Sequence, residues 1–330
     1  MKEAFLRELA VYFRFLSIIY LSKQFIFLLL MEYLPLGTTD LVVSRVGFGG
    51  MSLDPVAAAS PRLLARAQAA GITLFDTADL YDHGRNEALF CAAFRNCRAQ
   101  VVLATKVGNQ WRPDGQGWDW NPSKAYILQA AEASLRRLQT DYIDLYQLHG
   151  GTLDDDHDEV LEAFELLREQ GKIRHYGISS IRPNVIRRYV SSPSRLTSVM
   201  LQLSLLDQRP REAVLELLQD NGVGVLARGA LAQGRLSGKP AGDYLGHSTA
   251  EVARVAAAVT TVAAELGRTP AEVAVRFVLD TPGVTAAVLG IRTEAQLSEA
   301  LRLAECPPLM AEAREQLLAA VPATLYEQHR

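Results

Sequence analysis

The stretch LFDTADLYDHGRNE, Leu74 to Glu87, begins with the apolar residues of a buried strand and then turns polar. Asp76 interrupts the apolar run, and Tyr81 follows in the segment after it. A carboxylate is costly to bury unless another group pairs with it. The stretch therefore predicts a strand that ends at a polar site, with the tyrosine presented by the following loop.

Similar apolar runs recur along the chain and alternate with segments of helical period. The helical pattern is clear in LLARAQAAG (63–71), LQAAEASLRRL (128–138) and EVLEAFELLREQG (159–171). Fully buried strands that alternate with helices pair in parallel, and eight such units in roughly 250 residues match a closed (β/α)8 TIM barrel of the α/β class. The expected strands are residues 45–50, 73–78, 101–107, 142–149, 174–179, 198–204, 222–228 and 286–291.

An open doubly wound sheet is the alternative architecture. Such sheets usually carry a GxGxxG loop after the first strand, and GFGGMSLDP (47–55) does not supply that spacing. Before the barrel, residues 32–50 contain two short strand-like runs and predict a β-hairpin that plugs its N-terminal end. Two long rim loops, 108–123 and 229–249, are interpreted as binding loops.

The first 30 residues differ from the rest of the chain. Residues 10–30 are apolar but include Arg14 and Lys23, and charges inside a spanning helix are costly. This segment can be an accessory amphipathic helix, a weak membrane anchor, or sequence upstream of the true start at Met31. We favour the third interpretation because the hairpin pattern begins directly after Met31. We therefore expect one barrel domain over residues 31–330 and no stable membrane association.

Composition excludes several classes of protein. The 330 residues carry a formal net charge of -3, which provides no basic field for nucleic acid. Three cysteines without a CxxC motif argue against a zinc ribbon and a disulfide framework, and they fit a reducing cytoplasm. The acidic run DDDHDE (154–159) is interpreted as charge that favours a helix N-terminus, so no metal is expected.

Polar residues stand at the ends of three consecutive predicted strands: Asp76, Lys106 and His149. Neighbouring parallel strands lie about 4.8 Å apart and end at one rim of the barrel, so these side chains should converge, with Tyr81 folding over them. A lysine beside a carboxylate keeps its proton, and its ammonium group eases proton donation by a nearby phenol. A histidine there can orient a carbonyl oxygen. This set suits protonation of a carbonyl while a nicotinamide or flavin supplies hydride.

These motifs resemble those of the aldo-keto reductase family, and the resemblance extends from Met31 to about Leu309. It implies a (β/α)8 barrel that uses NADPH, with Tyr81 as general acid, Lys106 and Asp76 as the pair that tunes it, and His149 as the group that orients the substrate. The matching motifs are DTA (76–78) with Tyr81 and Asn86-Glu87, Thr105-Lys106, DLYQLH (144–149) and EQGKIRHYGISS (169–180).

The resemblance also implies which residues hold NADPH. The family's strand-six glutamine falls on Met200 or Gln202, depending on alignment, and Leu203 stands where the family has an aromatic that stacks on the nicotinamide. Ala300 replaces the family's usual asparagine. Arg292 suits a bidentate contact with a 2′-phosphate, which favours NADP over NAD. The expected cofactor residues are Gly49, Ser179, Ser180, Gln202, Arg228, Gly229, Leu231, Gln233, Gly290, Arg292, Gln296 and Glu299.

The resulting hypothesis is reversible, NADPH-dependent reduction of an aldehyde or ketone to the alcohol. Trp111, Trp118 and Trp120 of the 108–123 loop are expected to form an apolar wall against the substrate, whereas three other residues of the Tyr81 segment are interpreted as solvated. Two alternatives stay open: an NADPH-binding regulatory or channel-type subunit with little turnover, and an isomerase or aldolase that uses the lysine as a Schiff-base nucleophile. The residues interpreted as solvated are Asp79, Asp82 and His83.

Overall fold

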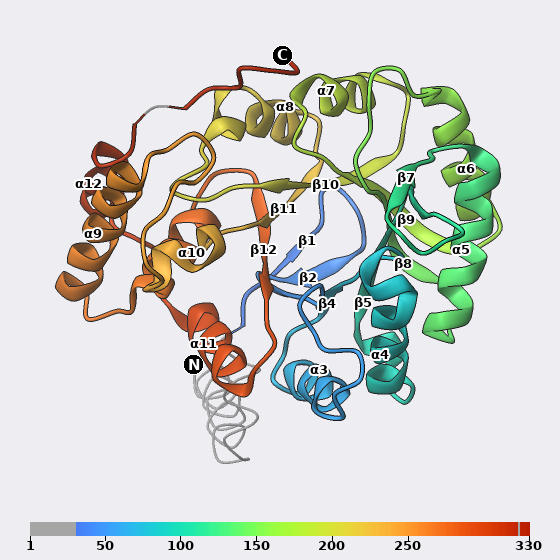
Figure 1. Ribbon diagram of the computed structural model, residues 1–330, viewed down its shortest axis with the longest axis horizontal. Helices are drawn as coiled ribbons and strands as arrows, with labels where there is room; N and C mark the ends of the chain where they lie inside the picture. The colour runs from blue at the N-terminus through green and yellow to red at the C-terminus, as the bar shows by residue number, and fades with distance from the viewer. Residues whose placement is uncertain (1–30, 323) are drawn as a thin grey trace, which may run out of the picture.

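The computed structural model describes residues 31–322 and 324–330, so the three interpretations of residues 1–30 lie outside the described residues. Eight parallel strands close into a barrel in the order β10-β11-β12-β3-β4-β5-β8-β9, and helices surround them (Figure 1). This confirms the predicted barrel. The barrel strands are β3 (Val46–Gly49), β4 (Leu74–Asp76), β5 (Val102–Val107), β8 (Ile143–Leu148), β9 (Ile173–Ser179), β10 (Leu196–Gln202), β11 (Gly224–Arg228) and β12 (Val284–Gly290).

The helices begin and end where local sequence signals place them. Ser123 caps the first turn of one helix through the backbone N–H of Tyr126, and Thr269 with Glu272 forms a capping box before Pro270 in another. Asp156 caps the helix that follows the acidic run, which confirms that interpretation. The helices are α3 (Ala59–Ala69), α4 (Arg85–Phe94), α5 (Lys124–Leu138), α6 (His157–Glu169), α7 (Pro183–Ser191), α8 (Val214–Asp220), α9 (Thr249–Glu265), α10 (Pro270–Leu279), α11 (Glu294–Glu305) and α12 (Ala311–Ala319).

The N-terminal hairpin consists of β1 (Tyr33–Pro35) and β2 (Val42–Ser44), and it closes one end of the barrel. Its residues Leu36, Leu41 and Val43 belong to the same buried cluster as side chains from inside the barrel. The turn at Gly37 rests against the starts of β10 and β11, where an added Cβ would lie 2.8 Å from the carbonyl oxygen of Thr197. The hairpin therefore plugs the N-terminal end, as predicted, and leaves the opposite rim open for a site.

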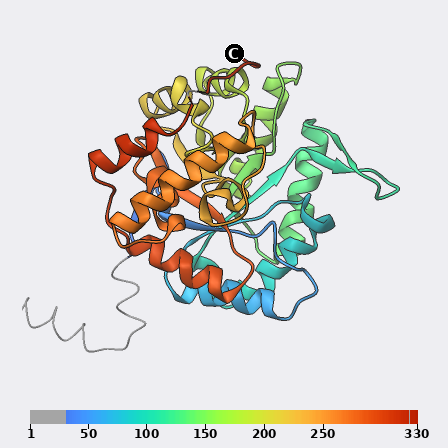
Figure 2. The same cartoon turned by 60° about the vertical axis from the view of Figure 1, so that its left-hand side comes forward.

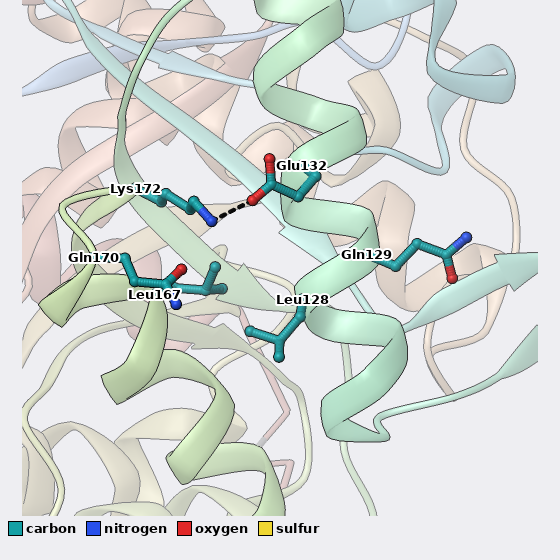
Figure 3. A pocket seen from close by; sticks show the side chains of 6 residues that line it. All are labelled: Leu128, Gln129, Glu132, Leu167, Gln170 and Lys172. Carbon is teal, nitrogen blue, oxygen red and sulfur yellow. Dashed lines mark ion pairs between the residues drawn. The ribbon is translucent and has the colours of Figure 1, made fainter.

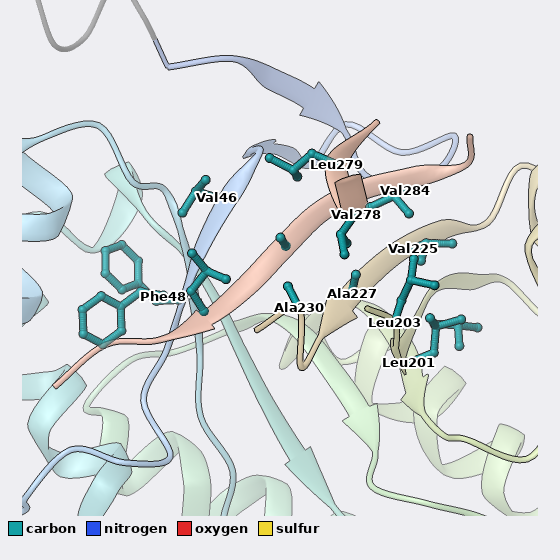
Figure 4. Close-up of a cluster of buried hydrophobic side chains, with 14 of the residues drawn as sticks. Val46, Phe48, Leu201, Leu203, Val225, Ala227, Ala230, Val278, Leu279 and Val284 are labelled. Carbon is teal, nitrogen blue, oxygen red and sulfur yellow. The ribbon is translucent and has the colours of Figure 1, made fainter. Parts of the chain in front are cut away.

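A second buried cluster fills the space between the barrel and its helices. Figure 4 shows Val46 and Phe48 of β3 and Leu201 of β10 on the outer face of their strands, in the same layer as Val278 of α10. Alternate residues of the strands thus fill the interior and the outer layer. Because both faces are buried, the strands read as continuous apolar runs in the sequence.

The two long rim loops contain structure of their own. Residues 108–123 form a hairpin, β6 (Asn109–Trp111) with β7 (Trp118–Trp120), which projects from the barrel in Figure 2. Residues 229–249 contain the short 3-10 helix η4 (Ala232–Ser237). Two further 3-10 helices, η1 (Tyr81–Gly84) after β4 and η3 (Arg209–Glu212) after β10, also follow strand ends, and η2 (Arg98–Gln100) lies before β5.

Candidate active site

The ammonium group of Lys106 is the centre of the polar cluster at the open rim. Its Nζ donates to Asp76 Oδ1 at 2.6 Å, to the carbonyl oxygen of Thr77 at 2.7 Å and to the hydroxyl of Tyr81 at 3.3 Å. These three contacts match the three N–H donors of an ammonium group. Lys106 is only 1% exposed and Asp76 only 4%. The structure thus brings together the acid, the lysine and the tyrosine that the strand ends indicate.

The register of the barrel accounts for this convergence. Asp76 of β4 lies opposite Ala104 of β5, and Lys106 lies opposite Gln147 of β8. Lys106 is therefore two residues closer to the rim than the backbone partner of Asp76, and its long side chain reaches back to the carboxylate. The amide of Gln147 approaches the second carboxylate oxygen at 3.4 Å.

The ion pair sets the protonation state of the lysine. Burial lowers the pKa of Lys106, but the charge of Asp76 and hydrogen bonds with Asp76 and Tyr81 together outweigh burial and raise it above the usual value. Burial also raises the pKa of Asp76, and the ammonium group opposes that shift. The lysine consequently stays protonated at neutral pH, with its charge next to the phenol of Tyr81.

His149 follows β8 directly and faces the tyrosine. The two rings meet edge to face, with centroids 5.9 Å apart and planes at 81°. Burial, and then the positive charges of Lys106 and Arg228, lower the pKa of His149 to about 3. The imidazole is therefore neutral at physiological pH and can donate one hydrogen bond to an oxygen placed between it and Tyr81.

The loop that carries Tyr81 has an unusual backbone. Asp82, His83 and Gly84 all have positive φ, at 49°, 55° and 80°. A Cβ at Gly84 would lie 2.6 Å from Nε of Arg137, so only glycine fits there. Such a conformation persists only where surrounding contacts hold it.

Two side chains anchor the ends of this loop. Asn86 accepts from the hydroxyl of Thr77 at 2.7 Å and donates to the carbonyl oxygen of Gly50 at 2.9 Å. The indole N–H of Trp111 donates to the carbonyl oxygen of Leu80 at 3.2 Å. The loop is thus tied to β4, to the loop after β3 and to β6, and Tyr81 stands between these anchors.

The interpretation of Asp79 as a solvated residue is wrong. Asp79 is 8% exposed, and its backbone N–H donates to the carbonyl oxygen of Lys106 at 3.3 Å, so the loop keeps it next to β5. His83 is exposed but stacks on Trp111, with ring centroids 3.7 Å apart. Asp82 pairs with Arg85 at 2.5 Å on the surface. Of the three residues, only His83 is exposed as expected, and Asp82 is half-buried.

The three tryptophans predicted to face a substrate have different surroundings. Trp120 donates to Asp155 at 2.8 Å, and its ring covers the backbone of Gly108 and Gly150. Trp111 is held by the loop of Tyr81, as described above. Trp118 is 46% exposed, so of the three it presents the largest free surface at this rim.

Gln202, at the end of β10, lies at the open rim, whereas Met200 is buried inside the barrel. Of the two residues that could match the family's glutamine, Met200 and Gln202, Gln202 is therefore the one that lies at the rim. Its oxygen accepts from Arg228 at 3.0 Å, and its nitrogen donates to Asp207 at 3.0 Å and to the hydroxyl of Tyr244 at 3.3 Å. These contacts fix the orientation of the amide and direct the Arg228 guanidinium along the rim.

Sequence reasoning missed Asp207 and Tyr244. Leu203, which stands in the aromatic position of the family, is fully buried in the outer layer and offers no surface at the rim (Figure 4). Tyr244 comes from the 229–249 loop, where no local pattern predicts which side chain turns inward. Asp207 pairs with Arg209 at 2.7 Å, and the sequence DQR (207–209) was the available signal.

The remaining predicted cofactor residues lie along the same rim and beyond β12. Ser179 ends β9, Ser180 follows it, and both are buried. Gly49 lies between Gly290 and Asp76 in the barrel register. The segment after β11 turns at Gly229, whose φ is 78°. Further along it, Leu231 precedes η4 and Gln233 accepts from Arg235 at 2.8 Å. Glu299 is half-buried on α11.

A cavity lies between the loop after β3 and the start of α11. Arg292 lines it together with Ser52, Asp54, Ser60 and Thr293. Among the described residues Arg292 has no ion-pair partner, and its backbone N–H donates to Gln296 at 3.0 Å. The guanidinium group is therefore free to bind an anion, and the hydroxyls around it are suited to the same task. An anion bound there would also face the carboxylate of Asp54, whose Oδ1 accepts from Val56 N.

A second cavity has no connection with the catalytic tetrad of Asp76, Tyr81, Lys106 and His149. It is a groove on the outer surface between α5 and α6, bridged by the ion pair of Lys172 and Glu132 (Figure 3). The part of the chain that the structure describes holds no group of three or more His, Cys, Asp or Glu side chains placed to bind a metal. Nor does any helix within residues 31–322 and 324–330 combine the length and apolar character needed to cross a membrane.

Comparisons with known proteins agree with this geometry. Residues 45–320 match the profile of the Aldo/keto reductase family. The chain is 44% identical to the uncharacterized oxidoreductase YqkF of Bacillus subtilis over 304 residues, which are 89% of this chain and 98% of that protein. It is 32% identical to the NADH-specific methylglyoxal reductase of Escherichia coli over 235 residues, 65% of this chain and 72% of the relative.

A solved structure is similar over almost its whole length. The holo form of aldo-keto reductase AKR11C1 from Bacillus halodurans superposes with a TM-score of 0.86 at 44% identity, covering 91% of this chain and 99% of that one. The chain therefore belongs to the aldo/keto reductase family. It is an oxidoreductase of the kind that reduces carbonyl groups with a nicotinamide cofactor.

Proposed function

We propose that this protein reduces an aldehyde or ketone to the alcohol, reversibly, with NADPH as the cofactor and Tyr81 as the proton donor. The observation that carries the proposal is the contact between Lys106 Nζ and the Tyr81 hydroxyl at 3.3 Å, with Asp76 on the other side of the ammonium group. The ammonium stabilises the phenolate that remains after proton transfer. A bound nicotinamide would supply the hydride.

Each residue of the tetrad has a separate part in the reaction. The carbonyl oxygen lies between the hydroxyl of Tyr81 and the neutral imidazole of His149, which donates a hydrogen bond and orients it. Tyr81 gives its proton to that oxygen as negative charge develops there. Lys106 holds the resulting phenolate, and Asp76 keeps the lysine protonated and correctly placed.

The cofactor would lie along the rim, from the tetrad to the cavity at Arg292. Ser179, Ser180 and Gln202 are suited to hydrogen bonds with a carboxamide, since they stand beside the tetrad on neighbouring strands. Arg292 supports a preference for the 2′-phosphate of NADP, because it is a cation without an acid partner among the described residues. A relative named as NADH-specific indicates that this preference varies between relatives, so it needs its own test.

The lysine geometry argues against an aldolase or isomerase. A Schiff base requires a neutral amine with a free lone pair, whereas the Lys106 ammonium is protonated and donates to three oxygens. Leu203 is buried and presents no ring to a nicotinamide, so the regulatory alternative is decided by turnover rather than by this residue.

The test is consumption of NADPH, followed by its absorbance, with a panel of short aldehydes, hydroxy-aldehydes and quinones. We expect turnover above the background rate with at least one class of carbonyl. The same panel with NADH measures the cofactor preference. No loss of either cofactor with any substrate, although the protein binds NADPH, would overturn the proposal and favour the regulatory alternative.

A further inference from the structure

Asp79 is a buried acid that the proposed reaction does not use. It lies in the loop between β4 and Tyr81, is 8% exposed, and its backbone N–H donates to the carbonyl oxygen of Lys106 at 3.3 Å. Within the described residues its Oδ1 has no hydrogen-bond partner. The next residue in the chain, Leu80, accepts from the indole of Trp111. The backbone contact of Asp79 with Lys106 and that of Leu80 with Trp111 thus fix the loop just before Tyr81.

The charges around Asp79 come from four neighbouring elements. Glu87 on α4 is fully buried and accepts from Arg137 of α5 at 2.6 Å and from Thr105 of β5 at 2.7 Å. Arg137 therefore forms its ion pair with Glu87 and not with Asp79. Among the described residues, Asp79 has no ion-pair partner. The other ionisable groups that face it are Tyr126 on α5, Tyr146 on β8 and Lys106 on β5.

This environment favours the neutral carboxylic acid. Burial raises the pKa of Asp79 to about 8, and the negative charge of Glu87 adds to the shift. Arg137, a backbone hydrogen bond from Leu80 and the more distant Lys106 oppose it. A buried carboxylate without an ion-pair partner among the described residues is costly, even where hydrogen bonds from Leu80 and Tyr126 reach it, so ionisation would draw the side chain toward water. The segment 79–81 would have to move with it.

We propose that Asp79 is a positioning residue whose neutral form stays buried and leaves the Tyr81 loop bound to β5 through the backbone N–H of Asp79, and whose ionisation releases Tyr81 from Lys106. The inference rests on the proposed function for its effect on turnover. Its effect on the loop does not depend on the reaction. The activity of the enzyme should therefore fall as the pH rises through the titration of Asp79.

The first experiment compares the pH dependence of kcat for the wild type, Asp79→Asn and Asp82→Asn between about pH 6 and about pH 9.5. Asparagine has the shape of the protonated acid and cannot ionise. We expect Asp79→Asn to keep kcat near neutral pH to within about twofold and to lose the alkaline limb centred near pH 8. Asp82→Asn, a matched change of the half-buried acid three residues further along the same loop, should retain the wild-type profile. An alkaline limb unchanged in Asp79→Asn would overturn the positioning role.

The second experiment does not require turnover. The indole N–H resonance of Trp111, assigned by its absence in Trp111→Phe, reports on the contact with Leu80. We expect it to shift with pH in the wild type, with the same midpoint as the rate, and to stay constant in Asp79→Asn. A wild-type resonance that does not titrate, or one that titrates equally in the variant, contradicts the inference. If no carbonyl is reduced but the resonance behaves as expected, the proposed function fails and the coupling of Asp79 to the loop stands.

Discussion

Replacing Lys106 by methionine removes the ammonium group but nearly preserves the volume of the side chain. Asp76, which is 4% exposed, then loses the one ion-pair partner that it has among the described residues and keeps a weak contact with Gln147 at 3.4 Å. Removing one partner of a buried ion pair costs about 3–5 kcal/mol, because the remaining charge is desolvated without compensation. We therefore expect Lys106→Met to lower the free energy of unfolding by about that amount at neutral pH.

The matched control is the double variant Lys106→Met with Asp76→Asn. It contains neither charge, and replacing a whole buried pair by neutral groups is often almost neutral. We expect its stability to return to within about 1–2 kcal/mol of the wild type, which corresponds to a coupling energy of at least about 2 kcal/mol. Both values come from urea unfolding followed by circular dichroism, analysed as a double-mutant cycle.

The pH dependence of the single variant provides an internal check. Without the ammonium, burial raises the pKa of Asp76 further, so the folded state holds a proton that the unfolded chain releases. The stability deficit of Lys106→Met is then largest at neutral pH and shrinks as the pH falls toward the carboxyl range of the unfolded chain. Additive effects of the two substitutions, or a deficit that does not change with pH, would refute the account of the ion pair.

Three further outcomes follow from individual contacts. Gly84→Ala should lower the free energy of unfolding in urea by about 1–3 kcal/mol and also lower kcat, because its Cβ would meet Arg137 and the backbone there is left-handed. A wild-type kcat would show that the loop tolerates the change. The nitrogen resonances of the His149 ring should report a neutral imidazole between about pH 5 and 8, since its pKa lies near 3; a titration near the ordinary histidine value would contradict this. Arg292→Met should raise the Kd for NADPH about tenfold and leave the Kd for NADH almost unchanged, as measured by cofactor fluorescence. Equal changes in both Kd values would show that Arg292 does not bind the 2′-phosphate.

The barrel was predictable because its strands are buried on both faces and read as apolar runs. The predicted ends of the barrel strands differ from the observed ends by at most two residues. Differences of two residues occur at the end of β4, at both ends of β10 and at the starts of β11 and β12, where the hydrogen-bond ladder rather than hydrophobicity decides the boundary. The sequence predicts a loop where the hairpin β6–β7 lies, because strands of three residues are too short to show an alternating pattern.

The tetrad was predictable because strand ends share a rim, so the spacing of Asp76, Lys106 and His149 along the chain translates into proximity. The surroundings of Asp79 were not. Its position depends on a loop with three left-handed residues, and its neighbours Glu87 and Arg137 come from two separate helices. Tyr244 was missed for a similar reason, because contacts between a long loop and a strand end leave no periodic signal in the sequence.

The most direct test of proton donation by Tyr81 is single-turnover reduction by Tyr81→Phe, with NADPH bound beforehand and the best carbonyl of the substrate panel. The account predicts a rate lowered by about 10²–10⁴-fold, the usual contribution of a positioned general acid, and a Kd for NADPH within about twofold of the wild type. A variant that reduces the carbonyl at the wild-type rate would contradict the assignment of Tyr81, and with it the role given to Lys106 and Asp76.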